Sequence, residues 1–156
     1  MNKLIKKISI LIAFTLLFSI GLTTKTQTAD AAIVMDYCDF FSGNHYDKDK
    51  NIVVEEGNKK YGACHISYYH MDSPGKGKVS VDGEMKSQFA RHLVEQEMAD
   101  LAGKIYKQDN ITSVGNGKYR ADGYDIYLDQ YITVIFAKKK VDGQTRNSVI
   151  TMYPYK

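Results

Sequence analysis

The sequence predicts an α+β fold, with an N-terminal helical or loop segment and one main helix that packs on an antiparallel β-meander. Two patterns carry this prediction: apolar residues recur every three or four positions within residues 84–108, and alternate with polar ones beyond residue 117. The composition of the 156 residues, 44% apolar and 25% charged, is that of one globular domain with a modest core. Multidomain and fibrous proteins are thereby excluded.

The first 31 residues have the parts of a secretory signal peptide. Residues 1–7 carry three lysines, residues 8–22 are almost wholly apolar, and Ala29 and Ala31 occupy the two positions that a signal peptidase reads. A retained anchor is the alternative, but a membrane-spanning helix usually needs about 20 apolar residues. We therefore expect cleavage near Ala31, a secreted mature domain of residues 32–156, and no membrane association after processing.

The full chain has a formal net charge of +3, and the predicted signal peptide holds all of this excess. It contains four lysines and one aspartate, so its removal takes the basic and acidic counts from 21 and 18 to 17 and 17. The remaining charge is uneven, since residues 32–102 carry 8 basic and 12 acidic side chains and residues 103–156 carry 9 and 5. The basic run at residues 138–140 indicates either a solvated hairpin end or an edge that attracts phosphate.

Both cysteines, Cys38 and Cys64, remain after processing. An exported chain meets an oxidising compartment, so we predict a single disulfide between them. The chain has no C-x-x-C motif, and Cys64 beside His65 supplies only two of the four ligands that a structural zinc site needs. No metal site is therefore predicted.

Two polar stretches precede the main helix. Residues 44–60 indicate a surface loop or a short hairpin around Asn51–Glu55, and Asp72–Lys78, which contains a Pro-Gly pair, indicates a second loop. The main helix is predicted over Glu84–Gln108, where the apolar side chains form one stripe: Phe89, Leu93, Val94, Met98, Leu101 and Ile105.

After the helix the pattern is that of strands and turns. Residues 117–127 predict two strands joined by a turn at Asp122-Gly123. Residues 131–139 predict a strong strand, Asp142-Gly143 predicts a hairpin turn, and residues 148–153 predict the last strand.

Four histidines lie in the predicted mature domain, and histidine both takes and gives protons near neutral pH. One imidazole as base and one as acid suffice to cleave RNA through its 2′-hydroxyl. His65 and His70 fall on opposite faces of a strand, or about 140° apart on a helix, so they meet only if the chain bends between them. His92, on the flank of the predicted helix, is expected to be structural, and His45 to lie at the surface.

The last predicted strand offers a second set of polar groups. Thr151 and Tyr153 project from one face, while Ile150 and Met152 project from the other. The two hydroxyls could bind a phosphate or orient a histidine, and ordinary cross-strand packing is the alternative.

Several short motifs, in their order and spacing, resemble the bacterial EndoU-type ribonuclease toxin domains of the barnase–EndoU–colicin–RelE superfamily. They are His65-Ile-Ser-Tyr-Tyr-His70, Lys86-Ser87-Gln88-Phe89 leading into a helix, Gly117-Lys-Tyr119, and Val149-Ile-Thr151-Met-Tyr153-Pro154. The resemblance spans roughly Ala63 to Tyr155. It lacks a Gly-Gly-His context for the second histidine, which many of these domains have.

The resemblance implies a metal-independent endoribonuclease that needs no cofactor and leaves a 2′,3′-cyclic phosphate and a 5′-hydroxyl. His65 and His70 match the family's histidine pair, and Thr151 and Tyr153 match its terminal Thr-x-Tyr-Pro. Ser87 matches the small polar residue that opens the central helix, whose amide end binds phosphate. Lys86 and Tyr119 are further substrate-binding candidates from the same motifs.

The expected partner is RNA, such as tRNA, and the resemblance implies a cognate immunity or inhibitor protein for a monomeric toxin. Unpaired bases could stack on tyrosines of the basic C-terminal third: Tyr119, Tyr124, Tyr127 and Tyr131. The alternative function is that of a non-catalytic secreted domain, a cystatin-like module that binds or inhibits another protein. The two hypotheses differ in geometry, because only the enzyme requires both histidines and the Thr-x-Tyr pair in one cleft.

Overall fold

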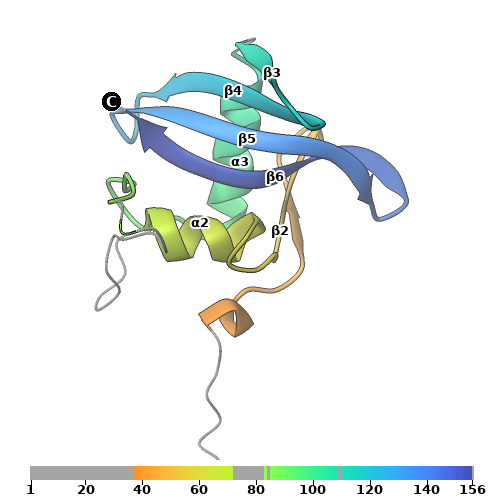
Figure 1. The fold of residues 1–156 in the computed structure, drawn as a ribbon, viewed down its shortest axis with the longest axis horizontal. Coiled ribbons are helices and arrows are strands. Elements are labelled where there is room, and N and C mark those ends of the chain that lie inside the picture. Colours follow the sequence, from red (N-terminus) through yellow and green to blue (C-terminus); the bar gives the residue numbers. More distant parts are fainter. Residues whose placement is uncertain (1–36, 72–82, 84, 109, 156) are drawn as a thin grey trace, which may run out of the picture. The chain divides into compact units, whose positions relative to one another are not determined.

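The computed structural model describes residues 37–71, 83, 85–108 and 110–155, and its ribbon is shown in Figure 1. These residues form a six-stranded sheet, a short 3-10 helix η1 (Tyr37–Phe40) and the helices α2 (Gly62–His70) and α3 (Glu95–Tyr106). The predicted α+β class is confirmed. The predicted signal peptide and the predicted Asp72–Lys78 loop lie outside the described residues.

The strand order across the sheet is β1-β2-β6-β5-β4-β3. The strands are β1 (Asn44–Tyr46), β2 (Ile52–Glu55), β3 (Ile111–Gly115), β4 (Lys118–Asp125), β5 (Gln130–Val141) and β6 (Gln144–Tyr155). Strands β3 to β6 form the predicted antiparallel meander, and the predicted turn at Asp142-Gly143 joins β5 to β6. Strand β2 adds to β6 in parallel, so the whole sheet is mixed. The parallel strand is buried throughout its apolar run, Ile52 to Val54, as strands covered on both faces usually are.

The predicted turn at Asp122-Gly123 is wrong, because β4 continues through both residues to Asp125. Gly123 faces α3, and a Cβ atom there would lie 2.3 Å from the Gln108 side chain and 3.1 Å from that of Ile105. The glycine therefore permits close packing of the helix on the sheet, and no reversal of the chain. The turn comes after β4, where the Asp125 carboxylate accepts backbone hydrogen bonds from Tyr127 and Leu128.

The main helix is shorter than predicted, since α3 begins at Glu95 and not at Glu84. The preceding segment is not helical and is mostly exposed, and only its Phe89 and Leu93 side chains are buried in the core. Its backbone is held from outside: the Phe89 amide donates to the His70 carbonyl, and Gln130 bonds the Gln88 carbonyl and the Ala90 amide. Phe89 and Leu93 are four residues apart and both buried, which is the spacing of a helical stripe, but this segment is not helical.

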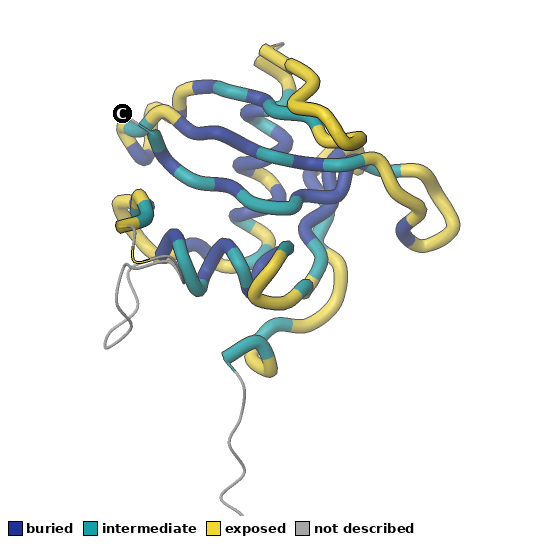
Figure 2. Tube along the Cα trace, in the orientation of Figure 1, coloured by how far each residue is buried: buried dark blue, intermediate teal, exposed yellow. Residues whose placement is uncertain are grey.

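Helix α3 covers one face of the sheet, behind β4 and β5 in Figure 1, and α2 lies along β6. The buried residues, dark blue along the trace in Figure 2, fall on α2, α3 and strands of the sheet. Those with no more than 2% exposure include Met98, Ile105, Val134 and Phe136, which belong to one hydrophobic core. The face of the meander opposite α3 carries the other alternating side chains, including Thr151 and Tyr153. No helix within the described residues is long and apolar enough to cross a membrane.

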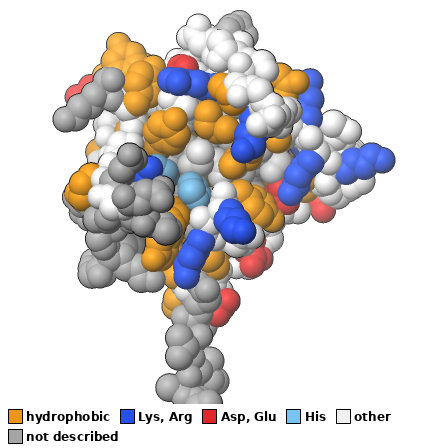
Figure 3. Space-filling view, viewed as in Figure 1, with side chains coloured by type: hydrophobic (Ala, Val, Ile, Leu, Met, Phe, Trp, Pro, Cys, Tyr) orange, Lys and Arg blue, Asp and Glu red, His pale blue; other side chains and the backbone are white. Residues whose placement is uncertain are grey.

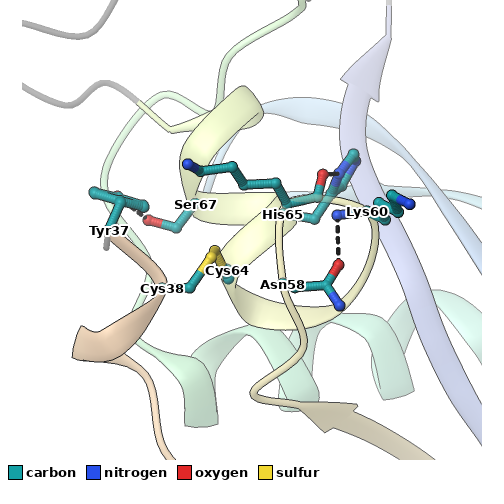
Figure 4. Close-up of a disulfide and its surroundings, with 8 residues drawn as sticks. Tyr37, Cys38, Asn58, Lys60, Cys64, His65 and Ser67 are labelled. Carbon is teal, nitrogen blue, oxygen red and sulfur yellow. Dashed lines mark hydrogen bonds between the residues drawn. A yellow bond between two sulfur atoms is a disulfide. The ribbon is translucent and has the colours of Figure 1, made fainter. Parts of the chain in front are cut away.

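Helix α2 was not assigned from the sequence, and it carries both candidate histidines. It begins at Gly62, whose φ of +78° and whose approach to the Glu55 carbonyl exclude a larger residue without strain. The predicted disulfide is confirmed: Cys38 of η1 is bonded to Cys64 of α2, and their Cα atoms are 5.2 Å apart (Figure 4). The Tyr37 hydroxyl also hydrogen-bonds the Ser67 hydroxyl at 2.6 Å, so α2 is fixed to the N-terminal segment at two points.

Candidate functional site

A pocket of about 680 Å³ opens between α2, the segment that precedes α3, and the end of β6. Six of the seven candidate catalytic or substrate-binding residues line it: both histidines, Lys86, Ser87, Thr151 and Tyr153. The other lining residues are Lys59, Tyr69, Met85, Pro154 and Tyr155. Segments from three parts of the sequence thus meet in one cleft, as the enzyme hypothesis requires.

The two histidine rings lie side by side, with ring centroids 5.7 Å apart. The expectation that they meet only where the chain bends is wrong, because both lie on the continuous helix α2, which packs against β6, at positions about 140° apart. His70 is the last residue of α2, and its ring stacks on Tyr153 of β6 at 5.3 Å and 29°. His65 contacts Tyr69, one turn further along the helix, at 5.0 Å.

Each imidazole is oriented by one backbone carbonyl. The Nδ1 of His65 lies 2.8 Å from the Lys59 oxygen, and the Nδ1 of His70 lies 3.0 Å from the Ser87 oxygen. A carbonyl only accepts, so both Nδ1 atoms carry the hydrogen and donate it. In the neutral rings Nε2 is then the basic nitrogen, and a base or acid needs this fixed geometry at its reacting atom.

Burial depresses the basicity of both rings. It lowers the pKa of His70, which is only 5% exposed, to about 4, against the opposing effect of the Ser87 carbonyl. A proton on His65 and the positive charge of Lys86 each lower it further. Burial also lowers the pKa of His65, and there the Lys59 carbonyl acts in the opposite direction. Both histidines are therefore neutral in the empty pocket at pH 7.

Thr151 and Tyr153 bring their side chains to the same wall from β6. They pair with Ile135 and Thr133 of β5 on the sheet face opposite α3. The Thr151 hydroxyl oxygen is buried and has no hydrogen-bond partner among the described residues, although a buried polar atom nearly always has one. The oxygen has almost no exposed surface, so a bound ligand would reach it only after rotation of the Thr151 side chain.

The charge of the pocket is one-sided. Lys59 and Lys86 line it together with the two imidazoles, and its described lining contains no aspartate or glutamate. Figure 3 shows histidine side chains exposed on this face with basic and hydrophobic side chains around them. A pocket with this lining favours an anion.

Two candidate residues differ from their prediction. Ser87 lines the pocket but does not open a helix, because α3 begins eight residues later; its role in the described structure is to orient His70 through its carbonyl. Tyr119 lies outside the pocket and faces α3, where it stacks on Phe136 at 5.6 Å. Alternation along β4 puts Tyr119 on the opposite face of the sheet from Arg120, so its ring belongs to the packed side.

The other two histidines are not part of this site. His45 lies on β1, where its ring contacts the Ser42 carbonyl at 3.1 Å. His92 is exposed in the segment before α3, not on the flank of the helix as predicted. Among the described residues no group of three or more His, Cys, Asp and Glu could hold a metal ion.

Sequence reasoning did not find Lys59, Tyr69, Met85 and Tyr155 as pocket residues. Tyr69 had a usable signal, since it lies one helical turn after His65 once α2 is recognised. Lys59 and Met85 come from irregular segments whose course no periodic pattern describes.

No known protein family, curated protein or solved structure matched the chain in the comparisons that we made.

Proposed function

We propose that the protein is a secreted endoribonuclease that cleaves RNA by attack of the 2′-hydroxyl and needs no metal ion. The observation that carries the proposal is the pair of carbonyl-oriented imidazoles, His70 buried and His65 half-buried, 5.7 Å apart between centroids, in a pocket with two lysines and no carboxylate in its described lining. One proton acceptor and one proton donor are what this transesterification requires, and a phosphodiester is the anion that such a pocket fits.

The different environments of the two histidines suggest their roles. A base must be neutral and an acid protonated, so the histidine with the lower pKa suits the base. We assign His70, with a pKa of about 4, as the base that takes the proton from O2′. His65 is the acid: O2′ attacks phosphorus, the bond from phosphorus to O5′ breaks, and His65 gives its proton to O5′. The products are a 2′,3′-cyclic phosphate and a 5′-hydroxyl.

The remaining pocket residues would stabilise the phosphate. Lys59 and Lys86 supply positive charge where negative charge develops on the nonbridging oxygens. Rotation of the Thr151 side chain would let its unpartnered hydroxyl donate to one of those oxygens. Tyr153 keeps the His70 ring in place by stacking on it.

The direct test is incubation of the purified protein with single-stranded RNA in excess chelator. We expect cleavage, and we expect His65→Ala and His70→Ala each to lower kcat/KM by at least 100-fold, the usual contribution of a general acid or base. The matched control is His92→Ala, because His92 is an exposed histidine outside the pocket, and this variant should cleave at the wild-type rate.

Two results would overturn the proposal. Folded wild-type protein that leaves RNA intact in chelator would favour a non-catalytic binding domain. Folded histidine variants that retain the wild-type rate would show that the cleavage comes from another site or from a contaminant.

A further inference from the structure

Three tyrosines form a row that leads out of the pocket across adjacent strands. Tyr155 of β6 lines the pocket, Tyr131 of β5 lies 5.8 Å from it between ring centroids, and Tyr124 of β4 lies 5.0 Å from Tyr131. The strand registers pair Tyr131 with Tyr155 and Tyr124 with Tyr131, so the three rings stand side by side on one face of the sheet. We call these three residues the tyrosine row.

The row lies on the face that α3 does not cover. Tyr131 is 55% exposed and Tyr124 is 38% exposed. By contrast, Tyr119 and Tyr106 face the packed side, where both contact Phe136. Aromatic side chains that serve only in packing are expected on the face that α3 covers. The tyrosine row is unusual because its rings are exposed to water on the other face.

The ends of the row are held in place. The Tyr124 hydroxyl donates a short hydrogen bond to the Asp129 carboxylate. Arg120 lies over the Tyr155 ring at 5.8 Å and is itself paired with Asp122 at 2.7 Å. The rings therefore form a preorganised surface, which lowers the entropic cost of binding a flat partner.

We infer that the tyrosine row binds the unpaired bases of single-stranded RNA next to the phosphate that is cleaved. The inference rests on the proposed function and adds a substrate class to it. Exposed aromatic rings on a sheet stack two or three bases in other RNA-binding domains, and they require bases whose faces are free. A duplex covers those faces, so it is excluded from the row. The pocket at the end of the row holds the positive charge that the backbone needs.

The test separates binding from cleavage. A 2′-O-methyl RNA octamer has no free 2′-hydroxyl and cannot be cut by the proposed route, and its Kd can be measured by fluorescence anisotropy. We expect Tyr131→Leu to raise the Kd by about 5- to 100-fold, from the loss of about 1–3 kcal/mol of stacking per base. Tyr131→Phe keeps the ring and should bind within about twofold of the wild type.

The matched control is Tyr127→Leu, because Tyr127 is 89% exposed but contacts Lys104 and lies outside the row. This variant should bind as the wild type does. A blunt-ended duplex of the same length should compete poorly for the protein. Circular dichroism of each variant shows whether it is folded.

The outcomes distinguish the row from the enzyme. If the octamer binds, its affinity depends on the ring of Tyr131 and natural RNA is never cut, then the tyrosine row binds RNA as inferred and the proposed function is wrong. If natural RNA is cut but folded Tyr131→Leu binds the octamer as tightly as wild type, the row is wrong and the function stands. Equal affinity for duplex and single strand, or no binding of the octamer, also overturns the row.

Discussion

The two histidines of the pocket have the same residue type but different surroundings. His70 ends α2, is buried against Tyr153, and has a pKa lowered to about 4 by that burial. His65 lies nearer to solvent on the same helix, and burial lowers its pKa below 6.5 as well. When the environments of two titratable groups move their pKa values apart, one group can act as the base and the other as the acid of the same site.

The first prediction concerns the pH dependence of cleavage. If His70 must be neutral and His65 protonated, kcat/KM should follow a bell with one limb near pH 4 and the other below pH 6.5. Initial rates in chelator across pH 3.5–8.5 measure this profile. A rate that keeps rising through pH 7 and 8 would contradict the assignment of His65 as the acid.

The second prediction concerns stability. The unfolded chain binds a proton at His70 near pH 6.5, whereas the folded chain does so only near pH 4, so unfolding takes up a proton between these values. The free energy of unfolding should therefore fall as the pH drops from 6.5 to 4, by about 3 kcal/mol from this residue. Urea unfolding at several pH values measures the slope. His70→Gln should remove most of it, and an unchanged slope would mean that other groups cause it.

At the scale of elements, α2 is the part that makes the site. It carries both histidines, its last carbonyl holds the segment before α3, and its Cys64 joins it to η1. Figure 4 shows that His65 directly follows the disulfide on this helix. The histidines are thus placed by a short helix whose N-terminal half is anchored covalently.

Loss of the disulfide should weaken this anchor. Closing a loop between residues 26 apart is worth about 3 kcal/mol in the chain-entropy model. We expect reductant to lower the free energy of unfolding of the wild type by about that amount. The double variant Cys38→Ser, Cys64→Ala should be less stable than the oxidised wild type, both with and without reductant. Its free energy of unfolding should not change when reductant is added. Identical urea midpoints for oxidised and reduced wild type would contradict this account.

The elements also show what the sequence allowed one to predict. The meander and its Asp142-Gly143 turn followed from alternation and a turn pair, which are local signals. The hydroxyls of Thr151 and Tyr153 followed from the same alternation. The start of α3 did not, because Phe89 and Leu93 are buried by contacts with distant segments, and burial alone does not specify a helix. The resemblance implied that His65 and His70 act as a pair. Their place in one pocket depends on the packing of α2 on β6, which no spacing rule could derive.

At the scale of the whole molecule, the net charge differs from the charge at the pocket. Residues 32–156 hold 17 basic and 17 acidic side chains, yet the described lining of the pocket holds two lysines and no acid. Affinity for RNA should therefore come from a few phosphates at the pocket and from stacking, which salt does not screen.

This balance predicts a shallow salt dependence. With one or two phosphates neutralised, the slope of log affinity against log salt concentration should be about −1, since each contact in a single strand contributes about −0.7. Lys86→Gln should make the slope shallower by about 0.7, while Tyr131→Leu should weaken binding equally at all salt concentrations. Anisotropy titrations with the 2′-O-methyl octamer at 50–500 mM salt measure both. A slope of −4 or steeper would point to an extended basic surface instead.

The chemistry of the RNA ends tests the central claim most directly. RNA cut by the purified protein in chelator should carry 2′,3′-cyclic phosphate and 5′-hydroxyl ends, and a single 2′-deoxy substitution should prevent cleavage at that position alone. Ends with 3′-hydroxyl and 5′-phosphate groups, or cleavage at the 2′-deoxy position, would contradict attack by the 2′-hydroxyl and with it the roles of His65 and His70.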